Sequence, residues 1–168
     1  ISDKVFTRYE LGLPKNAFVF CCFNQSYKIT PYVFDIWMEI MQKIPNSVFW
    51  LLEDNIFASE NIKKEAAKRN IESSRIIFAK EMNLQDHLAR HKLADLFIDT
   101  FPYTAHTTCS DALWSGLPVL TRMGQTFASR VAASLLTSIG LKELITNSKK
   151  EYVDLAVELA NNPNKLNS

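Results

Sequence analysis

The sequence predicts a three-layer α/β fold, a doubly wound parallel sheet of the Rossmann-like type, and three observations support this prediction. Short apolar runs alternate along the chain with longer amphipathic stretches. These runs are apolar throughout, as expected for parallel strands that helices cover on both faces. Right-handed crossovers then leave few topologies for such a chain. With 168 residues, the chain suits one domain with its own core, so we expect a single domain over residues 1–168.

The first half of the chain supplies two expected strands and two expected helices. Residues 18–23, FVFCCF, form a continuous apolar run, typical of a strand buried on both faces. Pro31 suits a first helical turn, and apolar residues then recur on one face as far as about residue 43. After a turn, residues 48–52 form the next strand. Residues 59–70 indicate a charged surface helix with Ser59 as its candidate N-cap.

The second half continues the same alternation. It contains no internal repeat and no low-complexity segment, and the final residues NNPNKLNS indicate a frayed or cut end. The expected strands cover residues 75–78, 96–98 and 119–120, and the expected helices cover about 84–91, about 107–115, 127–137 and 149–161.

Composition and charge exclude several classes of protein. The chain has 19 basic and 18 acidic residues, a net charge of +1, so nothing indicates a nucleic-acid partner. No apolar run approaches the roughly 20 residues of a membrane span, and the first residues do not resemble a signal peptide. The three cysteines fit neither a disulfide framework nor a zinc site. We therefore expect reduced, buried cysteines in a cytoplasmic protein with no membrane partner.

In a doubly wound sheet, ligands bind outside the carboxyl ends of the strands. Four loops qualify by this rule, at residues 24–30, 53–58, 79–84 and 99–108. The first of them lies within FNQSYKITP, residues 23–31. Lys28 can neutralise a phosphate there and Gln25 can donate its amide, although a single loop lysine is usually just solvated. Neither GxGxxG nor GxxxxGK[ST] occurs, so dinucleotide and P-loop binding are not supported.

The segment TAHTTCSDALWSGLP, residues 104–118, is the most unusual of these loops. A helix starting at Thr107 or Thr108 would direct its free N–H groups and the threonine hydroxyls toward an anion such as a pyrophosphate. Alternatively, one threonine is a simple N-cap and Asp111 completes a start like a capping box. His106 favours the anion site, and Asp111 is then placed to accept hydrogen bonds from ribose hydroxyls.

The segment MNLQDHLARHKLAD, residues 82–95, places His87 and Arg90 three residues apart, hence on one helical face. An imidazole and a guanidinium suit stacking on a nucleobase and hydrogen bonding to it. The alternative is a polar surface face with Leu84, Leu88 and Leu93 packed inward. The histidines do not have the ligand spacing of a metal site, and no Ser-His-Asp or Cys-His triad is indicated. Together the three segments fit a nucleoside diphosphate.

Several of these segments also resemble a known family. FNQSYKI, PNSVFWLL, RIIF, HTTCSDALWSGLPVLT and ASRVAASLL are similar, in this order, to motifs of the protein O-GlcNAc transferase and Spindly-like family. The resemblance runs from about Leu11 to Leu159. It implies the C-terminal, nucleotide-sugar-binding Rossmann-like domain of a larger GT-B glycosyltransferase. That enzyme would modify Ser or Thr side chains in the cytoplasm and nucleus.

The resemblance implies a role for each candidate residue. The donor would be UDP-GlcNAc, with no cofactor and no metal, and the reaction one inverting displacement in which Lys28 stabilises the departing phosphate. Acceptor proteins would bind through an N-terminal half and helical repeats, without which this chain would not catalyse transfer. The implied contacts are Gln25, Lys28, Thr107 and Thr108 to the diphosphate, His106 near the sugar, Asp111 to the ribose, and His87 to the uracil, supported by Arg90 and the backbone around Met82.

The chain departs from the animal members of that family at three positions. Leu84 replaces a lysine near the ribose, Glu53 replaces an arginine after the second strand, and Gln125 replaces a glutamate. Related members use GDP-fucose or UDP-glucose, so these donors remain alternatives. Two further alternatives are a nucleotide-binding module without catalysis and a receiver- or flavodoxin-like domain. A receiver would need an acidic cluster that the residues around Asn24 and Asp99 do not supply.

Overall fold

The computed structural model describes residues 5–24, 28–53, 55–100, 107–122, 136 and 144–162, with the backbone alone at 107–110 and 122. Six parallel strands form one sheet with the order β3-β2-β1-β4-β5-β6. The chain therefore builds the sheet outward from β1 in one direction, then crosses over to β4 and builds outward in the other. This is the strand order of a doubly wound Rossmann-type sheet, and it confirms the predicted fold class.

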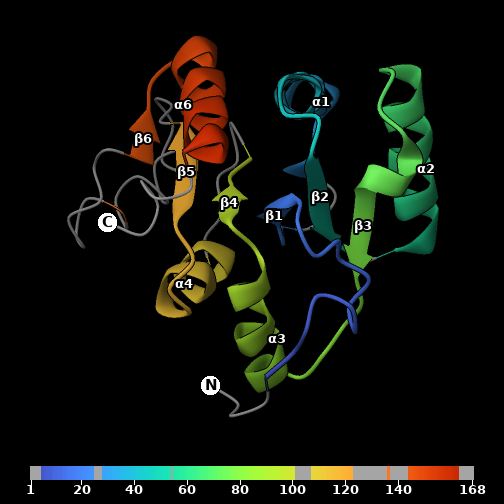
Figure 1. Ribbon diagram of the computed structural model, residues 1–168, viewed down its shortest axis with the longest axis vertical. Coiled ribbons are helices and arrows are strands. Elements are labelled where there is room, and N and C mark those ends of the chain that lie inside the picture. The colour runs from blue at the N-terminus through green and yellow to red at the C-terminus, as the bar shows by residue number, and fades with distance from the viewer. Residues whose placement is uncertain are drawn as a thin grey trace.

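The helices cover both faces of the sheet. In Figure 1, α1 and α6 lie side by side on one face, and α3 and α4 lie on the other. Three layers result, as predicted. The strands are β1 (Phe18–Cys22), β2 (Ser47–Leu52), β3 (Ile76–Ala79), β4 (Leu96–Ile98), β5 (Val119–Arg122) and β6 (Ile145–Thr146); the helices are α1 (Pro31–Lys43), α2 (Ile56–Lys68), α3 (Leu84–Arg90), α4 (Thr107–Trp114) and α6 (Lys149–Asn161), with short 3-10 helices η2 (Ser73–Arg75) and η3 (His91–Leu93).

The central strands are apolar because both of their faces are buried. All five residues of β1 are buried, and its two cysteines are free thiols in this core. On the α1 side, the Trp37 ring stacks on Phe49 of β2 with ring centres 4.5 Å apart. Helix α1 begins as predicted, with Pro31 in its first turn and the Thr30 hydroxyl accepting a hydrogen bond from the Val33 N–H.

The prediction for α2 was wrong at its start. The helix begins at Ile56, and its N-cap is Asn55, whose side chain accepts hydrogen bonds from the N–H groups of Phe57 and Ala58. Asparagine is a strong N-cap residue, whereas Ser59 is buried inside the first turn and donates to the Asn55 carbonyl. The prediction underestimated the length of β5, and it omitted β6, which has two residues. The expected helix over 127–137 lies outside the described residues except for Leu136, which is helical and buried.

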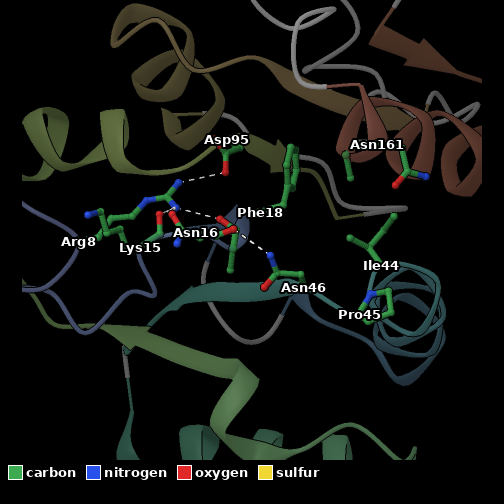
Figure 2. Close-up of a pocket in the computed structure, with 11 residues that line it drawn as sticks. Arg8, Lys15, Asn16, Phe18, Ile44, Pro45, Asn46, Asp95 and Asn161 are labelled. Carbon is green, nitrogen blue, oxygen red and sulfur yellow. Dashed lines mark hydrogen bonds and ion pairs between the residues drawn. The ribbon is translucent and has the colours of Figure 1, made fainter.

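The amino edge of the sheet is held together by Arg8. Its guanidinium donates to Asp95 (3.1 Å) and to the carbonyls of Ala17 (2.8 Å) and Leu93 (3.2 Å), which come just before β1 and β4. Figure 2 shows this arginine at one end of a pocket of about 420 Å³ that also receives Asn161 from the end of α6. The pocket lies at the edge opposite to the candidate site.

Candidate functional site

Buried polar side chains join three strands at the carboxyl edge of the sheet. Asp99, directly after β4, accepts hydrogen bonds from the Thr121 hydroxyl of β5 (2.8 Å), the Thr100 N–H (2.8 Å) and the Asn24 amide (3.3 Å). The Asn24 amide also donates to the Thr100 hydroxyl at 2.8 Å. All four residues are buried. The loops that leave β1 and β4 therefore start from one fixed platform, which we call the Asp99 platform.

Helix α6 also contributes a side chain to this platform, Tyr152. The Tyr152 hydroxyl donates to the Asp99 carbonyl at 2.8 Å and accepts a hydrogen bond from the Trp37 indole of α1 at 2.9 Å. Burial raises the pKa of the Tyr152 hydroxyl well above its usual value, so the group stays protonated and keeps donating. A chain of hydrogen bonds thus connects α1 and α6 to the start of the segment that leads to α4.

His87 and Arg90 lie beside this platform, at the end of β1. The His87 ring packs on Phe23, the residue after β1, with ring centres 5.0 Å apart. Arg90 donates to His87 Nδ1 through Nε (2.9 Å) and Nη2 (2.6 Å), and to the Lys80 carbonyl through Nη1 (2.6 Å). Burial, together with the positive charge of Arg90, lowers the pKa of His87 to about 3. The ring is therefore neutral at neutral pH, which suits stacking.

His91 lies behind His87, fully buried. Its ring contacts those of Phe23 and His87, with centres 5.1 Å and 4.8 Å away, and its Nδ1 is 2.8 Å from the His87 carbonyl. Burial lowers the pKa of His91 to about 4. The Trp50 ring of β2 packs on the Phe23 ring, with ring centres 5.0 Å apart. Aromatic rings directly after β1, in β2 and in η3 therefore support the His87 ring.

The structure places the other predicted site residues to different extents. Lys28 is half-buried at the carboxyl edge, near Cys22 at the end of β1. Met82 is half-buried just before α3. Asp111 is half-buried in α4, and burial raises the pKa of its carboxyl group. Helix α4 starts at Thr107, as predicted, although the side chains of Thr107 and Thr108 lie outside the described residues, as do Gln25 and His106.

Two positions where the sequence departs from the animal members can be placed. Leu84, the first residue of α3, is 63% exposed, so it does not pack inward as the alternative for this helix required. The Glu53 N–H donates to the Ala79 carbonyl at 2.8 Å, which ties the ends of β2 and β3 together. Gln125 lies outside the described residues.

Sequence reasoning missed the Asp99 platform as a part of the site. A polar pair, Asp99-Thr100, directly follows the apolar run of β4 in the sequence, and this was the available signal. Its partners Thr121 and Tyr152 lie 22 and 53 residues further on, and no local pattern connects them.

Neither a metal site nor a membrane span emerges from the part of the chain that the structure describes. Within it, no three His, Cys, Asp or Glu side chains gather closely enough to hold a metal ion. No described helix has the length and apolar character needed to cross a bilayer.

The strand order, the two helical layers and the polar carboxyl edge define a doubly wound α/β domain, the class that binds ligands at this edge. The chain belongs to glycosyl transferase family 41, whose profile matches residues 2–168.

Similar proteins agree with this family. The chain is 39% identical over 160 residues to the UDP-N-acetylglucosamine–peptide N-acetylglucosaminyltransferase of Caenorhabditis elegans, covering 95% of this chain and 14% of the relative. It is also 39% identical over 160 residues to the probable UDP-N-acetylglucosamine–peptide N-acetylglucosaminyltransferase SEC of Arabidopsis thaliana, covering 95% of this chain and 16% of the relative. A solved mutant of the Thermobaculum terrenum O-GlcNAc transferase superposes with a TM-score of 0.86 at 32% identity, covering 94% of this chain and 32% of that one. The chain thus spans about one seventh of the length of the two curated relatives and about one third of the Thermobaculum chain.

Proposed function

We propose that this chain is the donor-binding part of an inverting glycosyltransferase that transfers N-acetylglucosamine from UDP-GlcNAc to Ser or Thr hydroxyls of proteins. One observation carries the proposal. The Phe23–His87 contact brings α3 to the carboxyl end of β1, from which the chain leads to Lys28. A neutral stacking ring and a lysine thus share the edge where this class binds ligands. The names of the relatives support the choice of donor.

In this proposal each candidate residue contacts one part of the donor. The His87 ring stacks on the uracil, and Arg90 holds that ring by its hydrogen bonds to Nδ1. The half-buried Asp111, in the second turn of α4, accepts from the ribose hydroxyls. The backbone around Met82 borders the base, Gln25, Lys28, Thr107 and Thr108 bind the diphosphate, and His106 lies near the sugar.

Charge stabilisation is the main chemical contribution that these residues make. As an acceptor hydroxyl attacks the anomeric carbon, the bond to the diphosphate breaks and negative charge develops on the departing phosphate. The Lys28 ammonium and the N–H groups at the start of α4 stabilise that charge without a metal. The acceptor protein binds to the N-terminal half and helical repeats of the complete enzyme, so this chain alone binds donor and does not catalyse transfer.

Calorimetric titration of the chain with UDP and with GDP tests the proposal. We expect UDP to bind with the same affinity with and without magnesium. We expect Lys28→Ala to weaken UDP binding about 10- to 100-fold, because a hydrogen bond to a charged group is worth about 1.5–3 kcal/mol. Lys15→Ala is the matched control, because it removes the same charge from an exposed position at the opposite edge. An equal loss in both variants would contradict the site.

The same titration separates the alternative functions. Tighter binding of GDP than of UDP would replace the uridine sugar by a GDP-fucose donor, and UDP-glucose would be tested as a competitor of UDP. In the complete enzyme, Lys28→Ala should lower turnover far more than it lowers thermal stability. UDP binding by a complete protein that transfers no sugar would favour a nucleotide-binding module without catalysis.

A further inference from the structure

Among the described residues, no carboxylate accepts a hydrogen bond from the buried Arg90. Its side chain is 1% exposed, and its guanidinium donates to the Lys80 carbonyl and to His87 Nδ1 while its centre lies 5.2 Å from the Phe23 ring centre. Burial lowers the pKa of Arg90 to about 10, so the group still carries its charge at neutral pH. A buried charge is costly unless hydrogen bonds satisfy it, and His87 Nδ1 is one of the acceptors that do so here.

The Arg90 contact decides which His87 nitrogen carries the proton. A guanidinium has five N–H donors and no acceptor, so His87 Nδ1 must accept at both 2.9 Å and 2.6 Å. A neutral imidazole that accepts at Nδ1 carries its hydrogen on Nε2. Protonation of Nδ1 would direct an N–H at a cation and break both hydrogen bonds, so Arg90 opposes the imidazolium form as well.

His91 is fixed in the opposite way. A carbonyl oxygen only accepts, so the 2.8 Å contact between His91 Nδ1 and the His87 carbonyl requires a hydrogen on Nδ1. The remaining nitrogen, Nε2, is buried and has no hydrogen-bond partner in the part of the chain that the structure describes. A neutral ring with its lone pair on Nε2 avoids a buried, unsatisfied N–H. Two histidines one turn apart thus present different nitrogens as donors.

We propose that Arg90 is a positioning residue that holds the His87 imidazole neutral, in one orientation and in the Nε2–H tautomer, while His91 behind it is held in the Nδ1–H tautomer. Nε2 lies across the ring from Nδ1, so its N–H points away from Arg90. A nucleobase over His87 therefore meets a flat, uncharged ring whose only N–H is on the nitrogen that does not contact Arg90. This role rests on the proposed function, because it takes His87 as the residue that stacks on the base.

The described groups around His87 are consistent with a ring that does not titrate near neutral pH. From its own helix and η3, Arg90 and His91 face it. Phe23, directly after β1, contacts the ring, and the buried Cys21 thiol of β1 lies near Arg90. Burial raises the pKa of that thiol well above its usual value, so the thiol is neutral. At the start of α3 the Asp86 carboxylate accepts a hydrogen bond from the Asn83 amide, and the Asp86 N–H donates to the Asn83 side chain. None of these described contacts brings a carboxylate to His87 to favour its charged form.

Nitrogen-15 NMR of the histidine rings in the ligand-free chain tests this directly. The chain has three histidines, and single substitutions of His87 and His91 assign the signals. We expect His87 to show a protonated Nε2 and a bare Nδ1, His91 to show the reverse, and neither ring to titrate between about pH 5.5 and about pH 8. A His87 ring that is protonated on Nδ1, or that titrates in this range, overturns the proposal.

Two variants of Arg90 and one control assign the effect to this residue. Arg90→Met removes both hydrogen bonds and the charge, so we expect His87 to populate both tautomers. Arg90→Lys keeps a donor and a charge, so we expect it to keep the Nε2–H tautomer. Arg75→Gln is the control, because this arginine donates to the carbonyls of Met41, Ile44 and Ser47, away from His87. If Arg90→Met is too unstable to study, the wild-type tautomers and the lysine variant still decide.

Failure of the proposed function has a different signature. If UDP binds at the proposed site, it shifts the His87 ring signals more than those of His91, which is buried behind it. Rings in the expected tautomers that do not respond to saturating UDP would refute the base site while upholding the effect of Arg90 on His87. Rings in the wrong tautomers that do respond to UDP would refute the inference alone.

Discussion

Replacing Thr121 by valine removes one oxygen from the Asp99 platform at nearly constant side-chain volume. The lost hydrogen bond runs from the Thr121 hydroxyl to Asp99 Oδ2 over 2.8 Å, and both side chains are fully buried. A hydrogen bond to a charged group contributes about 1.5–3 kcal/mol, while the added methyl group returns less than about 1 kcal/mol. We therefore expect Thr121→Val to lower the free energy of unfolding by about 1–2 kcal/mol.

A second threonine provides the matched control for this measurement. Thr146 of β6 is also buried and donates at the same distance of 2.8 Å, but to a neutral acceptor, the Thr121 carbonyl. Such a bond contributes only about 0.5–1.5 kcal/mol, so Thr146→Val should cost between about 0 and 1 kcal/mol.

Urea unfolding followed by tryptophan fluorescence compares the two variants, and thermal unfolding gives a second estimate. For a domain of this size about 1 kcal/mol corresponds to roughly 2–4 °C, so Thr121→Val should lower Tm by about 2–8 °C. A cost for Thr121→Val no larger than that for Thr146→Val would refute the reasoning that the Asp99 carboxylate makes this contact strong.

Three further predictions follow from other contacts. Tyr152→Phe deprives the Trp37 indole of its acceptor and the Asp99 carbonyl of its donor, so urea unfolding should show a loss of about 2–4 kcal/mol. Gly116 follows α4 with φ of 85°, and no atom of the described residues lies within 4 Å of an added Cβ, so Gly116→Ala should cost about 1 kcal/mol through backbone strain alone. A loss above about 3 kcal/mol in the urea unfolding would contradict this. The pKa values of about 3 for His87 and about 4 for His91 lie below the value of about 6.5 in the unfolded chain, so the unfolded chain binds more protons below about pH 6.5. The free energy of unfolding should therefore fall as the pH drops from about 6.5 toward 5, by at most about 1.4 kcal/mol per pH unit for each ring. His91→Gln should flatten this pH dependence.

The sheet and most helices were predictable because their signals are local. The run FVFCCF contains β1, and apolar spacing plus a polar start give α6 its observed bounds of Lys149–Asn161. The start of α2 was missed because Asn55 and Ser59 are both possible caps, and only the backbone decides between them. Strand β6 has two residues, too few for any period to show.

The candidate site was predictable to a smaller extent. Spacing of three residues on one helix placed His87 beside Arg90, and the structure confirms their contact at 2.9 Å. The tautomers of His87 and His91 depend on two hydrogen-bond partners, the Arg90 guanidinium, which donates, and the His87 carbonyl, which accepts. No residue pattern encodes these contacts. The Asp99 platform depends on residues brought together by three strands and α6, so only the folded chain reveals it.

The contribution of α6 to the Asp99 platform has a consequence for biosynthesis. Asn24 and Asp99 are synthesised before Thr121, and Tyr152 comes last, from the last described helix. Until residue 152 has emerged from the ribosome and docked, the Trp37 indole has no tyrosine to donate to. The loops of the candidate site thus acquire their final support only near the end of translation of this segment, and a nascent chain stalled before α6 should not yet hold a nucleotide.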